Sequence, residues 1–224
     1  MKKFVPIVII GILLCTAFGV AAFKAEDKTH DGQSKGSPPL VFVFGVHGNN
    51  SWYISDVNIS FQYDPSDVKE IWYKIGTTYV KYSEKFTVST DGIHNIPWYW
   101  IDKNGSRWDG LPIVFKIDKT PPINELSKQK LSKTEVKFTA AASDSASEIE
   151  KVEFYCDDVL KSTDTVGPSY EWTWTGTENQ QVYAIAYNYA GYSKESNTLP
   201  TPLSYVPHLF MLLRLLMQRL LLIG

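Results

Sequence analysis

Aromatic side chains are the residues of this sequence best suited to binding chemistry. Its 224 residues include seven Trp and thirteen Tyr. Trp and Tyr combine a large apolar ring face with a polar group, and the apolar faces of sugars stack on such planes. Trp72 is out of phase with Ile71 and Tyr73, a position that leaves both the exposed side of a strand and the core open to it. Trp72, Trp98 and Trp100 are therefore candidate ligand-facing aromatics, and burial in a core is the alternative for each of them.

The residues that commonly carry catalysis or hold metals show no functional pattern. The His residues lack the spacing to Cys or to an acid that a metal site requires, and they are His30, His47, His94 and His208. No nucleophile elbow, phosphate-binding glycine loop or dinucleotide fingerprint occurs. Residues 102–106 offer oxygen ligands, but they lack the spacing and closing Glu of a calcium loop, and an Asn-Gly turn accounts for them. The sequence therefore predicts no enzyme, no metal site and no cofactor.

The composition is that of a chain that folds around a core and does not bind nucleic acid. Apolar residues make up 44% of the chain and charged residues 21%. The formal net charge is -2, whereas a nucleic-acid partner requires a basic face. Abundant aromatic and β-branched residues suit a pleated, half-buried surface, so we expect an all-β protein.

The first residues have the order of an export signal. Lys2 and Lys3 precede an apolar run over residues 4–14, and small residues follow as far as Ala22. Residues 1–22 are therefore predicted to be a signal peptide, with an uncleaved membrane anchor as the alternative. The protein is accordingly expected to be secreted or at the cell surface.

The cysteines are Cys15 and Cys156, and the first leaves the chain if the signal is cleaved. A mature chain with one thiol forms no internal disulfide, so each domain must be stabilised by its core alone. Cys156 alternates with Val152 and Phe154 and is predicted to be a small buried hydrophobe.

An internal repeat indicates two domains. The run 57–61 is matched by 136–140, and the run 70–73 is matched by 151–154. Apolar residues occupy every second position in these runs, and turn signals separate them, as in short antiparallel strands. The spacing of roughly 80 residues is that of a small β-sandwich. Trp172 and Trp174 share one face of a strand and are interpreted as core residues of the second unit.

Several segments resemble known modules. The first unit resembles the Ig-like repeats of archaeal and bacterial surface proteins, through residues 51–57, 71–73, 92–94 and 102–105. The second resembles bacterial Ig-like domains, through residues 149–155, 169–174 and 184–187. The segment 117–122, Ile-Asp-Lys-Thr-Pro-Pro, is typical of junctions between such modules. The resemblance implies two tandem immunoglobulin-like β-sandwich domains, an extracellular spacer or adhesion role, and no catalytic residues.

These patterns divide the chain into five parts. The parts are a signal peptide over 1–22, a first sandwich over 38–118, a Pro-containing linker over 119–133, a second sandwich over 134–200 and an apolar helix over 208–223. The linker could also supply the first strand of the second sandwich. Candidate glycosylation sites in an exported chain are the Asn residues of three Asn-X-Ser sequences, Asn49, Asn58 and Asn104.

The C-terminal segment is apolar apart from Arg214, Gln218 and Arg219. As a helix, residues 209–223 would span about 22 Å, short of the roughly 30 Å hydrocarbon core of a bilayer. We therefore expect a helix that lies on a membrane or binds a partner, with a chain cut short as the alternative. Its apolar positions are Leu209, Leu212, Leu213, Leu216, Leu220 and Ile223.

Taken together, the sequence predicts a non-enzymatic extracellular protein that acts as an adhesion and spacer module at the cell surface. Its expected partners are a cell-envelope component, a glycan or another surface protein. The alternative is a carbohydrate-binding accessory module that uses exposed Trp and Tyr. An aromatic strip exposed on one sheet would favour that alternative.

Overall fold

The structure is a computed structural model that describes residues 21–24 and 37–201. Every regular element in these residues is a β-strand, which confirms the all-β expectation. No helix within them is long and apolar enough to cross a membrane. Residues 1–20 of the predicted signal peptide and the predicted helix over 208–223 lie outside the described residues.

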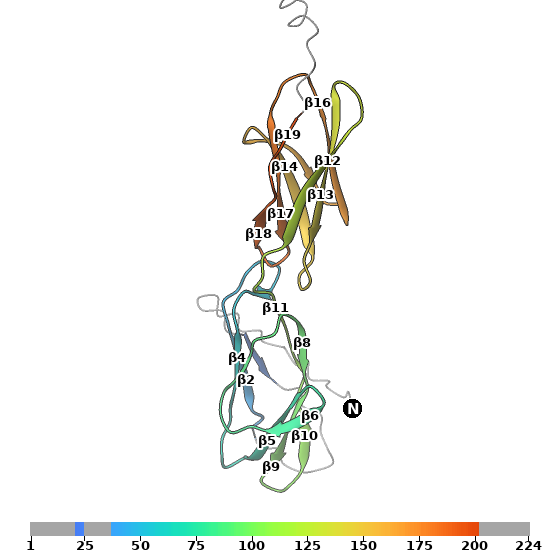
Figure 1. Cartoon of the computed structure of the whole chain (residues 1–224). Helices are drawn as coiled ribbons and strands as arrows, with labels where there is room; N and C mark the ends of the chain where they lie inside the picture. The colour runs from blue at the N-terminus through green and yellow to red at the C-terminus, as the bar shows by residue number, and fades with distance from the viewer. Residues whose placement is uncertain (1–20, 25–36, 202–224) are drawn as a thin grey trace, which may run out of the picture. The chain divides into compact units, whose positions relative to one another are not determined.

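The chain forms two compact units, each a sandwich of β-sheets (Figure 1). The first unit comprises Met1–Thr120, Ser145–Ser147 and Tyr189–Gly191. The second comprises Pro121–Asp144, Glu148–Asn188 and Tyr192–Gly224.

One layer of the first sandwich is a sheet in the order β1-β2-β4-β7. Its strands are β1 (Ala21–Lys24), β2 (Leu40–Phe44), β4 (Val57–Gln62) and β7 (Phe86–Val88). The alternation predicted for 57–61 is observed, because Val57, Ile59 and Phe61 are buried while Asn58 and Ser60 are partly exposed.

The other layer of the first sandwich contains two short sheets, in the orders β10-β9-β5-β6 and β3-β11-β8. Its strands are β3 (Trp52–Tyr53), β5 (Val68–Ile75), β6 (Thr78–Lys81), β8 (Gly92–Ile96), β9 (Trp98–Asp102), β10 (Arg107–Asp109) and β11 (Ile113–Ile117). Pro97 separates β8 from β9, because proline has no N–H to donate to a neighbouring strand. Its carbonyl still accepts a hydrogen bond from the Lys74 N–H at 2.9 Å.

The second sandwich has one sheet in the order β12-β13-β16 and another in the order β15-β14-β17-β18, with β19 also paired to β17. Its strands are β12 (Ile123–Lys130), β13 (Glu135–Ser143), β14 (Ile149–Cys156), β15 (Val159–Asp164), β16 (Ser169–Thr175), β17 (Gln181–Asn188), β18 (Ser193–Glu195) and β19 (Leu199–Pro200). Most of the segment predicted as a linker over 119–133 is therefore strand β12. Leu126 is its only buried residue, and so the strand lacks the alternation by which the others were recognised.

The two sandwiches share one pairing scheme. In the first, β2 pairs with β4, β4 with β7, β5 with β6 and β9, and β9 with β10. In the second, β12 pairs with β13, β13 with β16, β14 with β15 and β17, and β17 with β18. The repeated runs 57–61 and 136–140 thus lie in equivalent strands, as do 70–73 and 151–154.

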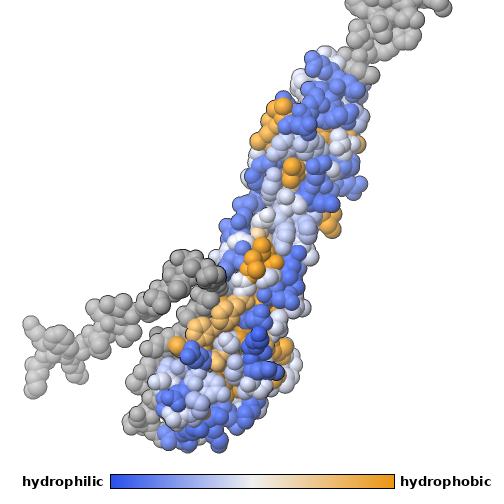
Figure 2. Space-filling view, turned by 90° about the vertical axis from the view of Figure 1, so that its left-hand side faces the viewer, coloured by the Kyte–Doolittle hydropathy of each residue, from blue (hydrophilic) through white to orange (hydrophobic). Residues whose placement is uncertain are grey.

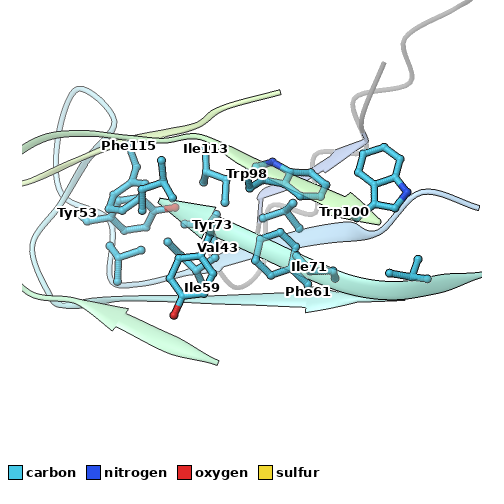
Figure 3. Packing of buried hydrophobic residues seen from close by; sticks show 14 of the residues in the cluster. Val43, Tyr53, Ile59, Phe61, Ile71, Tyr73, Trp98, Trp100, Ile113 and Phe115 are labelled. Carbon is cyan, nitrogen blue, oxygen red and sulfur yellow. The ribbon is translucent and has the colours of Figure 1, made fainter. Parts of the chain in front are cut away.

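The core of the first sandwich combines aromatic rings with Val and Ile side chains, and side chains from both layers point into it (Figure 3). Trp98 packs against Phe61 at 4.9 Å and against Trp100 at 5.5 Å between ring centroids. Trp98 Nε1 donates a hydrogen bond to the Leu111 carbonyl at 2.7 Å. Gly110 makes this approach possible, because a Cβ there would lie 2.1 Å from the Trp98 ring.

This packing corrects the interpretation of Trp98 and Trp100 as ligand-facing aromatics. Their exposed fractions are 3% and 2%, so both are core residues. Tyr99 lies between them in β9 and takes the outward-facing position. Three aromatic residues in succession left the inward phase of this strand open in the sequence, and only the second sheet determines it.

The core of the second sandwich combines large aromatics with small residues. Phe138, Phe154, Ala184 and Ala186 are all 0% exposed, and Trp174 is 5% exposed. Trp172 is partly buried against this core, as expected for the Trp172–Trp174 pair. Cys156 is 1% exposed, which confirms its predicted burial. Desolvation by this burial raises the pKa of its thiol.

Within the second sandwich the chain enters and leaves at opposite ends (Figure 1). Ile123 begins β12 beside Ser143, the last residue of β13. Pro200 pairs with Gln181, and its carbonyl accepts a hydrogen bond from Lys128 near the far end of β12. A strand of this length spans about 25 Å. The points where the chain enters and leaves this domain are therefore separated by most of the length of the domain.

The opposite placement of Trp100 and Trp72 predicts different costs of truncation. We expect Trp100→Ala to destabilise the first sandwich by about 3–5 kcal/mol, because it leaves a cavity in the core. We expect Trp72→Ala to cost about 1 kcal/mol, because that ring is partly exposed and loses mainly one hydrogen bond. Hydrogen–deuterium exchange of peptides from β4 and β9 measures both variants, and equal costs would contradict the assignment of the two faces.

Candidate functional site

The outer face of the sheet β10-β9-β5-β6 carries the main aromatic cluster exposed on the first sandwich. Trp72 in β5 lies directly opposite Tyr99 in β9. Tyr79 comes from β6, and Arg107 comes from β10. Successive side chains of a strand point to opposite faces, so Trp72 and Tyr99 point away from the core that their neighbours Ile71, Tyr73, Trp98 and Trp100 fill. We call Trp72, Tyr79, Tyr99 and Arg107 the aromatic face.

Tyr99 is the centre of the aromatic face. Its ring centroid lies 6.4 Å from that of Trp72, with an angle of 11° between the planes. Tyr79 meets it edge-on at 5.2 Å. The guanidinium carbon of Arg107 lies 3.8 Å from the Tyr99 centroid, within range of a cation–π interaction. One tyrosine on the central strand β9 therefore holds three planar groups, one from each of the other strands.

Two ion pairs border the aromatic face. Glu70 accepts hydrogen bonds from Lys81 Nζ at 2.9 Å and from Trp72 Nε1 at 3.0 Å. The bond from Lys81, followed by that from Trp72, lowers the pKa of Glu70 below its ordinary value. Arg107 donates two hydrogen bonds to Asp109 Oδ1, at 2.8 and 3.1 Å, and these raise the pKa of its guanidinium. These four charges are therefore paired, whereas Lys74, which lies opposite Tyr79 on the same face, forms no ion pair with the residues that the structure describes.

The aromatic face is accessible to solvent. Tyr79 is 37% exposed, and Trp72 and Tyr99 are partly exposed. The hydroxyl groups of Tyr79 and Tyr99 form no hydrogen bond with the residues that the structure describes. On the side of the molecule shown in Figure 2, hydrophobic residues occur in separate groups among hydrophilic ones. The gathering of aromatic rings, more than apolar character in general, distinguishes the aromatic face.

Of the three predicted ligand-facing tryptophans, the structure leaves Trp72 alone at an exposed site. Tyr79, Tyr99 and Arg107 were not identified from the sequence. Once Trp98 and Trp100 are assigned to the core, the alternation of side chains along the strand indicates that Tyr99 points outward. Tyr79 and Arg107 lie in short strands of mixed composition, and only the register of β6 and β10 against their neighbours brings them to Tyr99.

The second sandwich presents a different surface on its equivalent sheet. The rings of Tyr155 and Tyr183 stack there at 5.1 Å with an angle of 3°. The Tyr155 hydroxyl donates to Glu153 at 2.8 Å, and this bond, with burial, raises the pKa of Tyr155 to about 12. The Tyr183 hydroxyl donates to Asp158 at 3.2 Å. The polar groups of these tyrosines are thus bonded within the domain, unlike those of Tyr79 and Tyr99.

Asp102 is one of the oxygen-bearing residues of 102–106 that were considered as calcium ligands. It stabilises the turn between β9 and β10. Its Oδ1 accepts the N–H groups of Asn104 and Ser106, both at 2.9 Å, and its Oδ2 accepts Trp108 Nε1 at 2.9 Å. Burial raises the pKa of Asp102, but these hydrogen bonds together outweigh burial and bring the pKa below its ordinary value. Gly105 adopts a φ of 88°, which glycine tolerates without strain. The oxygen atoms of this carboxylate are therefore engaged in a structural role.

The second sandwich builds the same turn with an amide. Asn188 Oδ1 accepts the Tyr192 N–H at 2.8 Å, as Asp102 Oδ1 accepts that of Ser106. Asn188 Nδ2 donates to the Asp144 carboxylate at 3.0 Å. An indole N–H requires an acceptor and a carboxylate requires a donor, so the partner explains why one turn has Asp and the other has Asn.

The candidate glycosylation sites lie in different settings. Asn49 and Asn104 are exposed, and Asn58 is partly exposed in β4. Asn58 Oδ1 accepts a hydrogen bond from the Thr87 hydroxyl at 2.8 Å. Modification of these residues remains a prediction. Within residues 21–24 and 37–201, no group of three or more His, Cys, Asp or Glu side chains is arranged to hold a metal ion.

Comparison with known proteins finds a family model that matches the second sandwich. Residues 126–186 match the family model of a bacterial Ig domain. The first sandwich repeats the same strand pairing. The chain carries tandem Ig-like domains. No curated protein matches the chain.

Solved structures similar to the Ig-like domains include two multidomain fragments. Fibronectin(III)-like modules of CbhA from Clostridium thermocellum are 23% identical, with 71% of this chain and 90% of that chain covered and a TM-score of 0.34. A crystal structure of titin domains is 18% identical, with 70% of this chain and 61% of that chain covered and a TM-score of 0.38.

The different partners of the two turns predict that Asp102 cannot be replaced by Asn. We expect Asp102→Asn to cost the first Ig-like domain about 1–3 kcal/mol at neutral pH, because the amide cannot accept both from the loop N–H groups and from Trp108 Nε1. The folded pKa of Asp102 lies below that of the unfolded chain, so its contribution is complete above pH ~4 and is lost as the pH falls further. Denaturant titrations from pH 7 to pH 2 measure the free energy of unfolding. As the pH falls, this free energy should decrease less for Asp102→Asn than for the exposed Glu84→Gln. Equal acid losses would contradict this role.

The reciprocal change, Asn188→Asp, should fail for the opposite reason. It places a second carboxylate beside Asp144, and two adjacent carboxylates repel each other when both are ionised. We expect the second Ig-like domain to be less stable at pH 7 and to recover part of the loss near pH 4, where one carboxylate is protonated. Exchange of β17 peptides at the two pH values measures this, and a loss that does not change with pH would contradict it.

Proposed function

We propose that this chain is a non-enzymatic extracellular protein in which tandem Ig-like domains serve as an adhesion and spacer module at the cell surface. The observation that carries the spacer role is the path of the chain through the second domain, from Ile123 at one end to Pro200 at the other. A domain with this path lengthens a chain in series. Domains whose termini lie together would add bulk without adding length.

Self-contained cores also support a spacer role. Each domain has its own buried cluster, one around Trp98, Trp100 and Phe61 and the other around Phe138 and Phe154. Apolar burial of this extent stabilises each sandwich without a ligand. A spacer must persist outside the cell, where no chaperone refolds it, and independently stable domains meet that requirement.

The aromatic face supports the adhesion part of the proposal. Trp, Tyr and Arg are the residues that most often contribute the largest share of binding energy at recognition surfaces. The partners that we propose are a cell-envelope component, a glycan or another surface protein. A contact of residues 208–223 with a membrane surface is a further part of this proposal, and it rests on sequence alone.

Export can be tested by producing the full chain in a bacterium and treating intact cells with protease. We expect the chain to be labelled by antibody and digested on intact cells or in the medium, because residues 1–22 have the order of an export signal. The matched control lacks residues 2–22 and should stay protected inside the cell. Equal protection of both chains would overturn the surface assignment.

Adhesion requires a second measurement on the exported chain. The purified protein should bind intact cells or isolated envelopes in a saturable manner, measured by flow cytometry or sedimentation. Failure to bind any envelope preparation above a level set by an unrelated secreted protein would reduce the proposal to a spacer alone.

A further inference from the structure

We propose that the aromatic face binds an uncharged polysaccharide chain, with Trp72 and Tyr79 as the stacking residues and Tyr99 as the residue that positions them. This inference names a ligand class for the adhesion proposed above and so rests on it. It replaces the tryptophan set expected from the sequence with residues from β5, β6, β9 and β10.

The charges around the aromatic face favour an uncharged ligand. Glu70 is paired with Lys81, and Arg107 is paired with Asp109. An anionic polymer would have to compete with Glu70 and Asp109 for Lys81 and Arg107, and a cationic one with Lys81 and Arg107 for their acids. Lys74, opposite Tyr79, adds one cation outside these pairs, and the gel with an acidic polysaccharide tests its effect. Sugar hydroxyl groups, which both donate and accept, can bond to either member of each pair without separating it.

The geometry of the aromatic face fits an extended chain better than a small molecule. Small-molecule sites are concave and enclose most of the ligand, whereas this site is the outer side of a sheet. Trp72 in β5 and Tyr79 in β6 lie on either side of Tyr99 in the chain of ring contacts, at 6.4 and 5.2 Å between centroids. Two stacking residues on different strands can contact different sugars of one polymer.

The rings are held in place before any ligand arrives. Trp72 Nε1 is bonded to Glu70, and Tyr99 is in contact with Trp72, Tyr79 and Arg107. A site that is already ordered loses less conformational entropy on binding. The free hydroxyl groups of Tyr79 and Tyr99 are available to bond sugar hydroxyls.

A protein partner is the other class of ligand that Trp, Tyr and Arg could serve. Protein–protein interfaces are enriched in Arg but depleted of Lys, Glu and Asp. Here the Glu70 carboxylate accepts a hydrogen bond from Trp72 Nε1, so an acid contacts one of the stacking rings directly. A carboxylate in this position favours the hydrated, hydroxyl-rich ligand.

Affinity electrophoresis of the purified full chain tests the proposal. Native gels would contain one neutral polymer each, a β-1,4-glucan, a β-1,3-glucan, an α-glucan, a mannan or a xylan, beside a gel with an acidic polysaccharide. We expect at least one neutral polymer to retard the chain. Trp72→Ala and Tyr79→Ala should each weaken the interaction by about tenfold or more, and Trp72→Phe, which keeps a ring, should weaken it less.

Tyr63→Ala is the matched control. Tyr63 is 39% exposed and Tyr79 is 37% exposed, and both lie in the first domain, but Tyr63 follows β4 in the other layer. This variant should bind like the unchanged chain. Circular dichroism and exchange of β5 peptides would establish that Trp72→Ala remains folded.

The possible results separate the two proposals. Absence of retardation by every neutral polymer, retardation by the acidic polymer alone, or equal binding by Trp72→Ala and the unchanged chain would overturn the polysaccharide inference. Binding to envelopes that survives both Trp72→Ala and removal of glycans would overturn it too, while the adhesion proposal would stand. Polysaccharide binding by a chain that is never exported would leave the inference intact and overturn the surface function.

Discussion

Apolar packing between two sheets is the interaction on which every other feature of each domain depends. Among the described residues Cys156 is a free, buried thiol, so neither sandwich is crosslinked there and the core must supply the stability. The first domain meets this requirement in part with large aromatic rings, such as Trp98, which packs against both Phe61 and Trp100. The second does so with Phe138 and Phe154 at 0% exposure beside small alanines. Burying one side of a strand in this way fixes which side chains face water.

The aromatic face is a consequence of that constraint. Because Trp98 and Trp100 fill the core, Tyr99 must point outward, and the strand register places Trp72 opposite it. The same sheet of the second domain carries tyrosines whose hydroxyls are bonded to Glu153 and Asp158. The two domains share one strand-pairing scheme. The tyrosine hydroxyls on this sheet form no hydrogen bond with the described residues of the first domain, whereas those in the second domain are hydrogen-bonded to acids. The two domains are equivalent in fold and different in what their outer faces can recognise.

The turns after β9 and β17 show how the same local structure tolerates different chemistry. Both need an oxygen that accepts the N–H four residues on, and both have a glycine with positive φ one residue before that N–H. The other polar atom of the side chain matches its hydrogen-bond partner. Asp102 Oδ2 accepts an indole N–H, and Asn188 Nδ2 donates to a carboxylate. The Asp and Asn that resemble ion ligands in the sequence are thus explained by hydrogen bonding within each domain.

The sequence by itself determined the strands in which one face is buried, since alternation with period two follows from the geometry of any strand. It predicted the all-β fold, the burial of Cys156 and the repeated runs, and it placed Trp72 out of phase with Ile71 and Tyr73. It did not distinguish β12, which buries Leu126 alone, from a linker, and it did not determine the inward phase of Trp98 and Trp100. Only the tertiary structure decided these points, because an aromatic residue suits either face of a strand until a second sheet covers one of them. Tyr79, Tyr99 and Arg107 lie on three different strands, and pairing between β6, β5, β9 and β10 is what brings them together.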